Sequence, residues 1–157
     1  KKSAAHWASY LVKQGNVDPH TSTQIGIRGN PRTLDWLQAS YDIGYQVITM
    51  EEYKKLGHEK CSKMILDRLG DNPIYVTFDL DCLDTTVAPG TANLEPAFRG
   101  FNMDEARNLI QCLKGKNVIG GDVACLMPTK DNPNQITSMV AASIMFEIIC
   151  LISINLK

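Results

Sequence analysis

Two aspartates at the end of an apolar run are the residues of this chain best suited to chemistry. The run reads Tyr-Val-Thr-Phe-Asp-Leu-Asp-Cys-Leu-Asp over residues 75–84 and leads into Ala-Pro-Gly-Thr at 88–91. A β-strand places residues i and i+2 on one face, so Asp79 and Asp81 are predicted to point the same way. Two neighbouring carboxylates repel each other and lose hydration, a cost that a bound cation would remove. The pair therefore predicts a site for a divalent cation.

The donor atoms indicate which cations such a site would hold. Carboxylate oxygens are hard ligands, which suit Mg²⁺, Mn²⁺ or Ca²⁺ better than ions that favour thiolates. Neither Cys82 nor any Cys-x-x-Cys spacing offers a soft donor in its place. The alternative is that Asp79 and Asp81 only cap the turn after the strand, as aspartates often do.

Composition narrows the class of protein. At 157 residues the chain can bury a sizeable core, and we expect residues 1–157 to form a single domain. Sixteen basic and seventeen acidic residues give a net charge of −1, which favours a small ligand over nucleic acid or a membrane surface. Five cysteines, an odd number without patterned spacing, favour a reducing compartment, so we expect a cytoplasmic protein. The first residue is not Met, which suggests a fragment.

Strands and helices are predicted to alternate along the chain, in an α/β fold with a mainly parallel sheet and helices on both faces. In such sheets ligands lie beyond the carboxyl ends of strands, where Asp79, Asp81 and Asp122 fall. The predicted strands are 23–27, 46–49, 74–80 and 117–123, and the predicted helices are 33–40, 50–69, 102–113 and 135–153.

The most apolar segment of the chain is 139–156, which reaches the lower limit of length for a membrane span. Glu147 lies in its middle, and charged residues are rare inside a bilayer. A core helix packed on the sheet therefore explains the segment better than a membrane helix.

The acidic run and its Ala-Pro-Gly-Thr tail resemble the metal signature of the ureohydrolases, the arginase and agmatinase family, in an agmatinase-like form. Three other segments follow the order and spacing of the family's later half: Gln-Ile-Gly-Ile-Arg-Gly at 24–29, Gly-Tyr-Gln-Val-Ile-Thr at 44–49 and Gly-Gly-Asp-Val at 120–123. The resemblance covers nearly the whole chain. It implies a three-layer αβα fold, here expected as an incomplete domain. It also implies a pair of Mn²⁺ ions, hydrolysis of a guanidino compound to urea and an amine, and assembly as trimers or hexamers.

The resemblance also implies roles for individual residues. Asp79 and Asp81 match the two family acids that hold the metal pair. A guanidinium carbon is a poor electrophile, and a metal pair supplies the hydroxide that attacks it by lowering the pKa of bound water. Asp84 either orients a metal ligand from behind or caps its loop, and Asp122 either orients a ligand or ends its strand. The loop over 85–100 is expected to shape the substrate mouth.

Three residues fit the family pattern less closely. Cys125 replaces the acid that would pair with the guanidinium, so either another acid binds substrate, the substrate differs, or Cys125 is a plain core residue. His6 lies about two residues out of register with a family His-Gly element, and a histidine there could pass a proton to the leaving amine. Trp7 could stack on a planar cation, or both residues are simply at the surface.

The family's earlier half carries a Gly-Gly-Asp-His element and an Asp-Ala-His-x-Asp element, and neither occurs in this sequence. Two octahedral Mn²⁺ ions need roughly ten to twelve ligand positions, far more than two carboxylates offer. We therefore expect the chain alone to bind metal weakly, and a non-catalytic scaffold or assembly half is the alternative function. A haloacid-dehalogenase-type phosphatase fits worse, because Leu83 departs from its Asp-x-Asp-x-Thr/Val motif and no Gly-rich phosphate loop follows.

Overall fold

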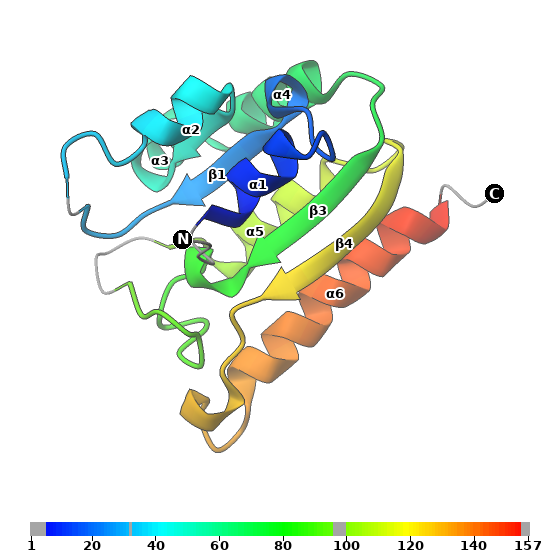
Figure 1. Ribbon diagram of the computed structural model, residues 1–157. Helices are drawn as coiled ribbons and strands as arrows, with labels where there is room; N and C mark the ends of the chain where they lie inside the picture. The colour runs from blue at the N-terminus through cyan, green and yellow to red at the C-terminus, as the bar shows by residue number, and fades with distance from the viewer. Residues whose placement is uncertain (1–5, 32, 96–99, 155–157) are drawn as a thin grey trace.

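The computed structural model describes residues 6–31, 33–95 and 100–154, and Figure 1 shows the arrangement of their helices and strands. The strands are β1 (Thr23–Ile27), β2 (Gln46–Thr49), β3 (Ile74–Asp79) and β4 (Val118–Ala124). The helices are α1 (Trp7–Lys13), α2 (Gln38–Ile43), α3 (Met50–Leu56), α4 (His58–Leu69), α5 (Met103–Gln111) and α6 (Ile136–Ile154), and three short 3₁₀ turns are η2 (Pro19–Thr21), η3 (Leu80–Cys82) and η4 (Pro128–Lys130).

All four predicted strands are confirmed to within one residue at either end. They pair in parallel, β1 with β2 and β3 with β4, as the α/β class requires. Among the described residues the two pairs are separate two-stranded sheets with no hydrogen-bonded ladder between them, rather than one continuous sheet. The α/β class with parallel strands is confirmed, in a less continuous form than predicted.

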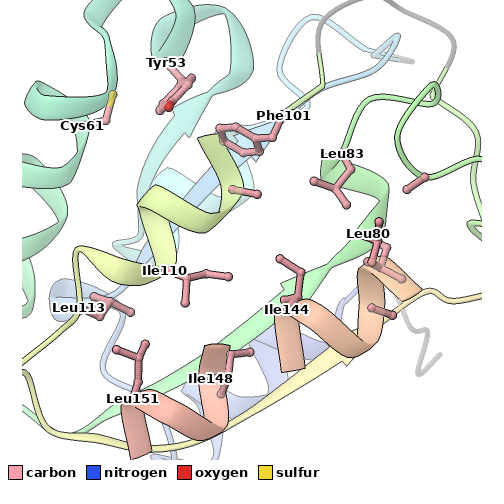
Figure 2. Close-up of a cluster of buried hydrophobic side chains, with 14 of the residues drawn as sticks. Tyr53, Cys61, Leu80, Leu83, Phe101, Ile110, Leu113, Ile144, Ile148 and Leu151 are labelled. Carbon is pink, nitrogen blue, oxygen red and sulfur yellow. The ribbon is translucent and has the colours of Figure 1, made fainter. Parts of the chain in front are cut away.

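One hydrophobic core joins the two strand pairs. Figure 2 shows Ile110 of α5 and Ile144 and Ile148 of α6 converging with Leu80 and Leu83, which follow β3. Each of these five side chains is almost fully buried. Because side chains alternate along a strand, β3 contributes one face to this core and leaves the other exposed. Asp79, the last residue of β3 and the first acid of the run, lies on the exposed face. Packing of the opposite face on the core therefore positions the acidic run.

Two predicted helices differ from those in the structure. The predicted helix over 50–69 is broken at Gly57, whose φ of +84° lies in the left-handed region that interrupts a right-handed helix. The prediction of a helix over 33–40 was wrong in position, since α2 begins only at Gln38. Leu34 lies within the predicted span, yet its side chain is fully exposed and so contributes no burial that would stabilise a helix there.

Helix α6 packs along β4, as predicted for a core helix. Its contact with the strand is close at Gly121, where an added Cβ would lie 2.8 Å from Ile148. The opposite face of α6 exposes Met139, Phe146 and Ile149. In length and composition α6 could also cross a membrane, and 33% of its apolar window is buried. The burial is therefore one-sided rather than complete.

The start of α6 is tied to the Ala-Pro-Gly-Thr tail of the acidic run. Asp131 accepts hydrogen bonds from the backbone N–H groups of Thr137 at 3.0 Å and Ser138 at 2.8 Å. The Thr137 hydroxyl, which is fully buried, accepts a hydrogen bond from the Gly90 N–H at 2.8 Å. A Cβ at Gly90 would lie 2.8 Å from the Asp131 Cα, so only glycine allows this approach. The tail is thereby held against the helix that supports β4.

Asp131 predicts how stability depends on pH. Burial raises the pKa of this carboxyl, but the hydrogen bonds from Ser138 and Thr137 outweigh it and hold the pKa well below the ordinary 3.8. A lowered folded-state pKa contributes stability above the ordinary pKa, which is lost as pH falls toward the folded value. We expect Asp131→Asn to destabilise the chain at pH 7, and the difference from wild type to shrink as urea unfolding is repeated below pH 3.8. A constant difference across that range would contradict the assignment.

Candidate metal centre

The carboxyl ends of β3 and β4 bring three potential metal ligands together. Asp79 is the last residue of β3 and pairs with Ala124, the last residue of β4. Cys125 follows directly, and its Sγ donates a hydrogen bond to Asp79 Oδ2 at 3.3 Å. One donor atom from each of Asp79, Asp81 and Cys125 lies within 4.8 Å of the others. The parallel pairing of the two strands thus adds a sulfur to the two predicted oxygens.

The two aspartates come together for a different reason than the sequence suggested. β3 ends at Asp79, and Asp81 lies in the η3 turn rather than on the same strand face. Asp79 Oδ1 caps this turn by accepting the Asp81 N–H at 2.9 Å. The capping alternative is therefore present at one oxygen of Asp79, while its other oxygen faces Cys125. A carboxylate has two oxygens, so capping by Oδ1 leaves Oδ2 able to serve as a ligand, and the metal role of Asp79 stays a prediction.

The site carries excess negative charge. Burial and the neighbouring Asp79 charge raise the pKa of Asp81, although hydrogen bonds from Asn93 and Thr91 oppose the shift. Burial, the hydrogen bond to Asp79 and the charges of both acids raise the pKa of the Cys125 thiol to about 12. A cation among the three groups would lower the pKa of Asp81 and of Cys125, since a nearby opposite charge favours the ionised form.

Arg28 and Asn93 hold the acidic turn in place, and sequence reasoning assigned neither a role. The Arg28 guanidinium donates to the backbone carbonyls of Asp81 at 3.1 Å, Leu83 at 2.7 Å and Glu95 at 2.9 Å. The Asn93 amide nitrogen Nδ2 donates to Asp81 Oδ2 at 3.2 Å. Arg28 lies in the Gln-Ile-Gly-Ile-Arg-Gly segment just after β1, so it links the two strand pairs at the site. The signal available in the sequence was a charged residue, Arg28, directly after an apolar strand.

Asp84 and Asp122 lie outside the ligand cluster. Asp84 accepts hydrogen bonds from the Thr86 hydroxyl at 2.6 Å and from the Gly100 N–H at 3.3 Å, which is the loop-capping role. These bonds, those to Thr86 above all, lower the pKa of Asp84. Asp122 accepts from the Thr77 hydroxyl at 2.9 Å on the exposed face of β3 and β4. The hydrogen bonds described for both acids therefore serve loop and strand, and a role toward a metal stays a prediction.

Trp7 begins helix α1, which the sequence did not predict, and His6 is the N-cap residue before it. Both side chains are exposed, and the backbone carbonyl of His6 accepts a hydrogen bond from Ser9 Oγ at 2.9 Å. In the part of the chain that the structure describes, no hydrogen bond joins either side chain to the acidic cluster. A proton-transfer role for His6 and a stacking role for Trp7 stay predictions. The expected substrate loop over 85–100 is described except for 96–99.

The donor set fits one divalent cation better than two. Two carboxylates and a thiol suit an ion that accepts both oxygen and sulfur ligands. A second ion would need ligands beyond the three donor residues that converge here, counting only the described residues. The geometry thus brings together part of a candidate metal centre at the carboxyl ends of parallel strands.

Comparison with known proteins identifies the family. The profile of the arginase family matches residues 1–151, and the chain belongs to this family. Over 142 residues it is 36% identical to a guanidinopropionase from Pseudomonas aeruginosa, covering 90% of this chain and 44% of that one. An agmatinase from Salmonella paratyphi B is 35% identical, over 87% of this chain and 41% of its own length. The resemblance inferred from the acidic run is confirmed.

A solved structure shows the same fold. Proclavaminate amidino hydrolase from Streptomyces clavuligerus superimposes with a TM-score of 0.82 at 31% sequence identity, covering 92% of this chain and 46% of that one. The arginase-like α/β fold is thereby confirmed for the described residues. The chain spans less than half the length of each of these relatives.

Proposed function

We propose that this chain forms the part of a ureohydrolase that carries the Asp79–Asp81 metal signature, and that the complete protein hydrolyses a guanidino compound to urea and an amine. The observation that carries this proposal is the convergence of Asp79, Asp81 and Cys125 at the carboxyl ends of β3 and β4 in a chain of the arginase family. The relatives are a guanidinopropionase and an agmatinase, which supports a guanidino substrate. Mn²⁺ is the ion that the family resemblance implies.

Four residues of the chain would have separate roles at the site. Asp79 and Asp81 would hold the cation, Asn93 would orient Asp81, and Arg28 would fix the turn between them. A pair of divalent cations bound in the complete site would supply hydroxide at neutral pH for attack on the guanidinium carbon, by lowering the pKa of water. We include in the proposal a cytoplasmic location, which suits five free cysteines, and a homo-oligomeric assembly.

Urea release tests this function. The chain would be assayed with Mn²⁺ and each of agmatine, guanidinobutyrate, guanidinopropionate, arginine and guanidine, both alone and joined behind the earlier half of the guanidinopropionase relative. We expect urea from the joined protein and little or none from the chain alone, because the described donors supply too few ligands for two ions. The same joined protein with Asp81→Asn is the matched control and should release no urea.

A non-catalytic scaffold is the second candidate function. The small donor set and the replacement of the expected substrate-binding acid by Cys125 favour it. A folded joined protein that releases no urea from any of the five compounds would support the scaffold and contradict the enzymatic proposal.

A further inference from the structure

Cys125 lies in the acidic cluster with Asp79 and Asp81 rather than in the described hydrophobic core. Three other cysteines, Cys61, Cys82 and Cys112, pack in or against the hydrophobic core, whereas Cys125 is not among the residues of that cluster that the structure describes. Its sulfur is half-buried and points at Asp79. Its place outside the described core cluster and beside the two acids favours a role other than that of a plain core residue.

The backbone around Cys125 directs its sulfur toward the two acids. The residue has a φ of +67°, in the left-handed region that side-chain-bearing residues seldom adopt. Its carbonyl accepts the Ala92 N–H at 2.9 Å, and the next residue, Leu126, pairs with Thr91 in an isolated antiparallel bridge. The segment after β4 is thus attached to the segment that follows the acidic turn. These two contacts hold the Cys125 sulfur close to the carboxylates of Asp79 and Asp81.

The spacing of the donor atoms suits a bound ion. In a tetrahedral zinc site, with bonds of about 2.3 Å to sulfur and about 2.0 Å to oxygen, neighbouring sulfur and oxygen ligands lie about 3.5 Å apart. Cys125 Sγ and Asp79 Oδ2 are 3.3 Å apart. Asp81 supplies a further oxygen within 4.8 Å of both residues' donor atoms. Only small side-chain movements would bring the three donors onto one cation.

We propose that Cys125 binds a divalent cation as a thiolate together with Asp79 and Asp81, and that it shifts the ion preference of this site from Mn²⁺ toward softer ions such as Zn²⁺ or Co²⁺. Thiolate ligands select zinc and its neighbours, whereas carboxylates alone suit manganese. The thiol proton passes to solvent as the ion binds, because the thiolate is the form that coordinates metal. This inference rests on the metal site in the proposed function and adds the identity of its third ligand.

Cobalt binding tests the proposal without relying on activity. The chain, freed of metal with a chelator, would be titrated with Co²⁺, and a cobalt–thiolate bond would give a charge-transfer band in the near ultraviolet. We expect the band in wild type and in Cys150→Ser, a matched control whose thiol lies toward the far end of α6. We expect no band in Cys125→Ser or Cys125→Glu. Equilibrium dialysis would count the bound Co²⁺ in each protein.

A competition experiment measures the shift in preference. Most oxygen and nitrogen sites already bind Zn²⁺ more tightly than Mn²⁺, so the informative quantity is the change in the Zn²⁺:Mn²⁺ affinity ratio between proteins. We expect Cys125→Ser and Cys125→Glu to lower this ratio by roughly tenfold or more. Stoichiometric Co²⁺ in wild type without the band, or a band that persists in Cys125→Ser, would overturn the role of Cys125 alone. A wild-type chain that binds no divalent ion would overturn the metal site as well.

Discussion

Asp81→Asn is expected to lower the affinity of the chain for divalent cations by more than about 100-fold, since even residues that only orient metal ligands contribute about 10–100-fold. The substitution keeps the size of the side chain and removes one of the two negative charges that face each other in the turn. Equilibrium dialysis with Mn²⁺ and Co²⁺ would measure the loss. Asp71→Asn is the control, because the Asp71 carboxylate is fully exposed on the surface and should not affect binding.

The same variant should not lose stability when no metal is present. Burial and the Asp79 charge raise the pKa of Asp81, so its charged form costs stability once pH rises through that raised value. Asparagine carries no such cost. We expect metal-free Asp81→Asn at pH 7 to unfold at the same temperature as wild type or higher, while wild type alone gains stability from added cations. An unfolded or strongly destabilised variant would mean that Asp81 serves the fold rather than an ion.

Arg28→Ala is expected to destabilise the chain by at least about 3 kcal/mol, because hydrogen bonds from a charged donor contribute about 1.5–3 kcal/mol each and three carbonyls lose theirs. The turn that carries Asp81 would lose its anchor to the strand end of β1. Cation affinity should therefore fall together with stability. Urea unfolding and Co²⁺ titration of the same preparation would measure the two effects.

Two further variants separate the Arg28 anchor from a general effect of charge. Arg107 forms an exposed ion pair with Glu147 at 2.8 Å, and exposed pairs contribute about 1 kcal/mol or less, so Arg107→Ala should change stability little. Arg28→Lys should fail to restore cation affinity, because a single ammonium cannot match the fork of donors that reaches three separate carbonyls. Full restoration by lysine would show that charge alone, and not the three hydrogen bonds, supports the turn.

Short sequence patterns predicted the strands, because strand formation here depends mainly on the side chains within each segment. Short β-branched and apolar runs gave β1 to β4 almost residue for residue, because such side chains suit a pleated, half-buried strand. The helix over 50–69 was predicted as continuous because its polar and apolar residues repeat correctly on both sides of Gly57. Its break depends on one backbone conformation at that glycine, which side-chain periodicity does not report.

The chemistry of the site was only partly predictable. Asp79 and Asp81 are neighbours in sequence, so their pairing could be proposed from spacing. Arg28 and Cys125 are 53 and 44 residues from Asp81 and reach it only through the parallel pairing of strands and the loop that follows the acidic turn. Contacts over such separations depend on the register between paired strands, which the sequence of one segment alone does not determine. The sulfur donor therefore became evident only from the assembled strand ends.

The most direct test of the metal centre is a crystal of this chain soaked in Mn²⁺ or Co²⁺ at a concentration that saturates binding in solution, with the ion located by its anomalous scattering. We expect one strong peak in contact with carboxylate oxygens of both Asp79 and Asp81. Two carboxylates turned away from each other, with no ion between them, would contradict the account.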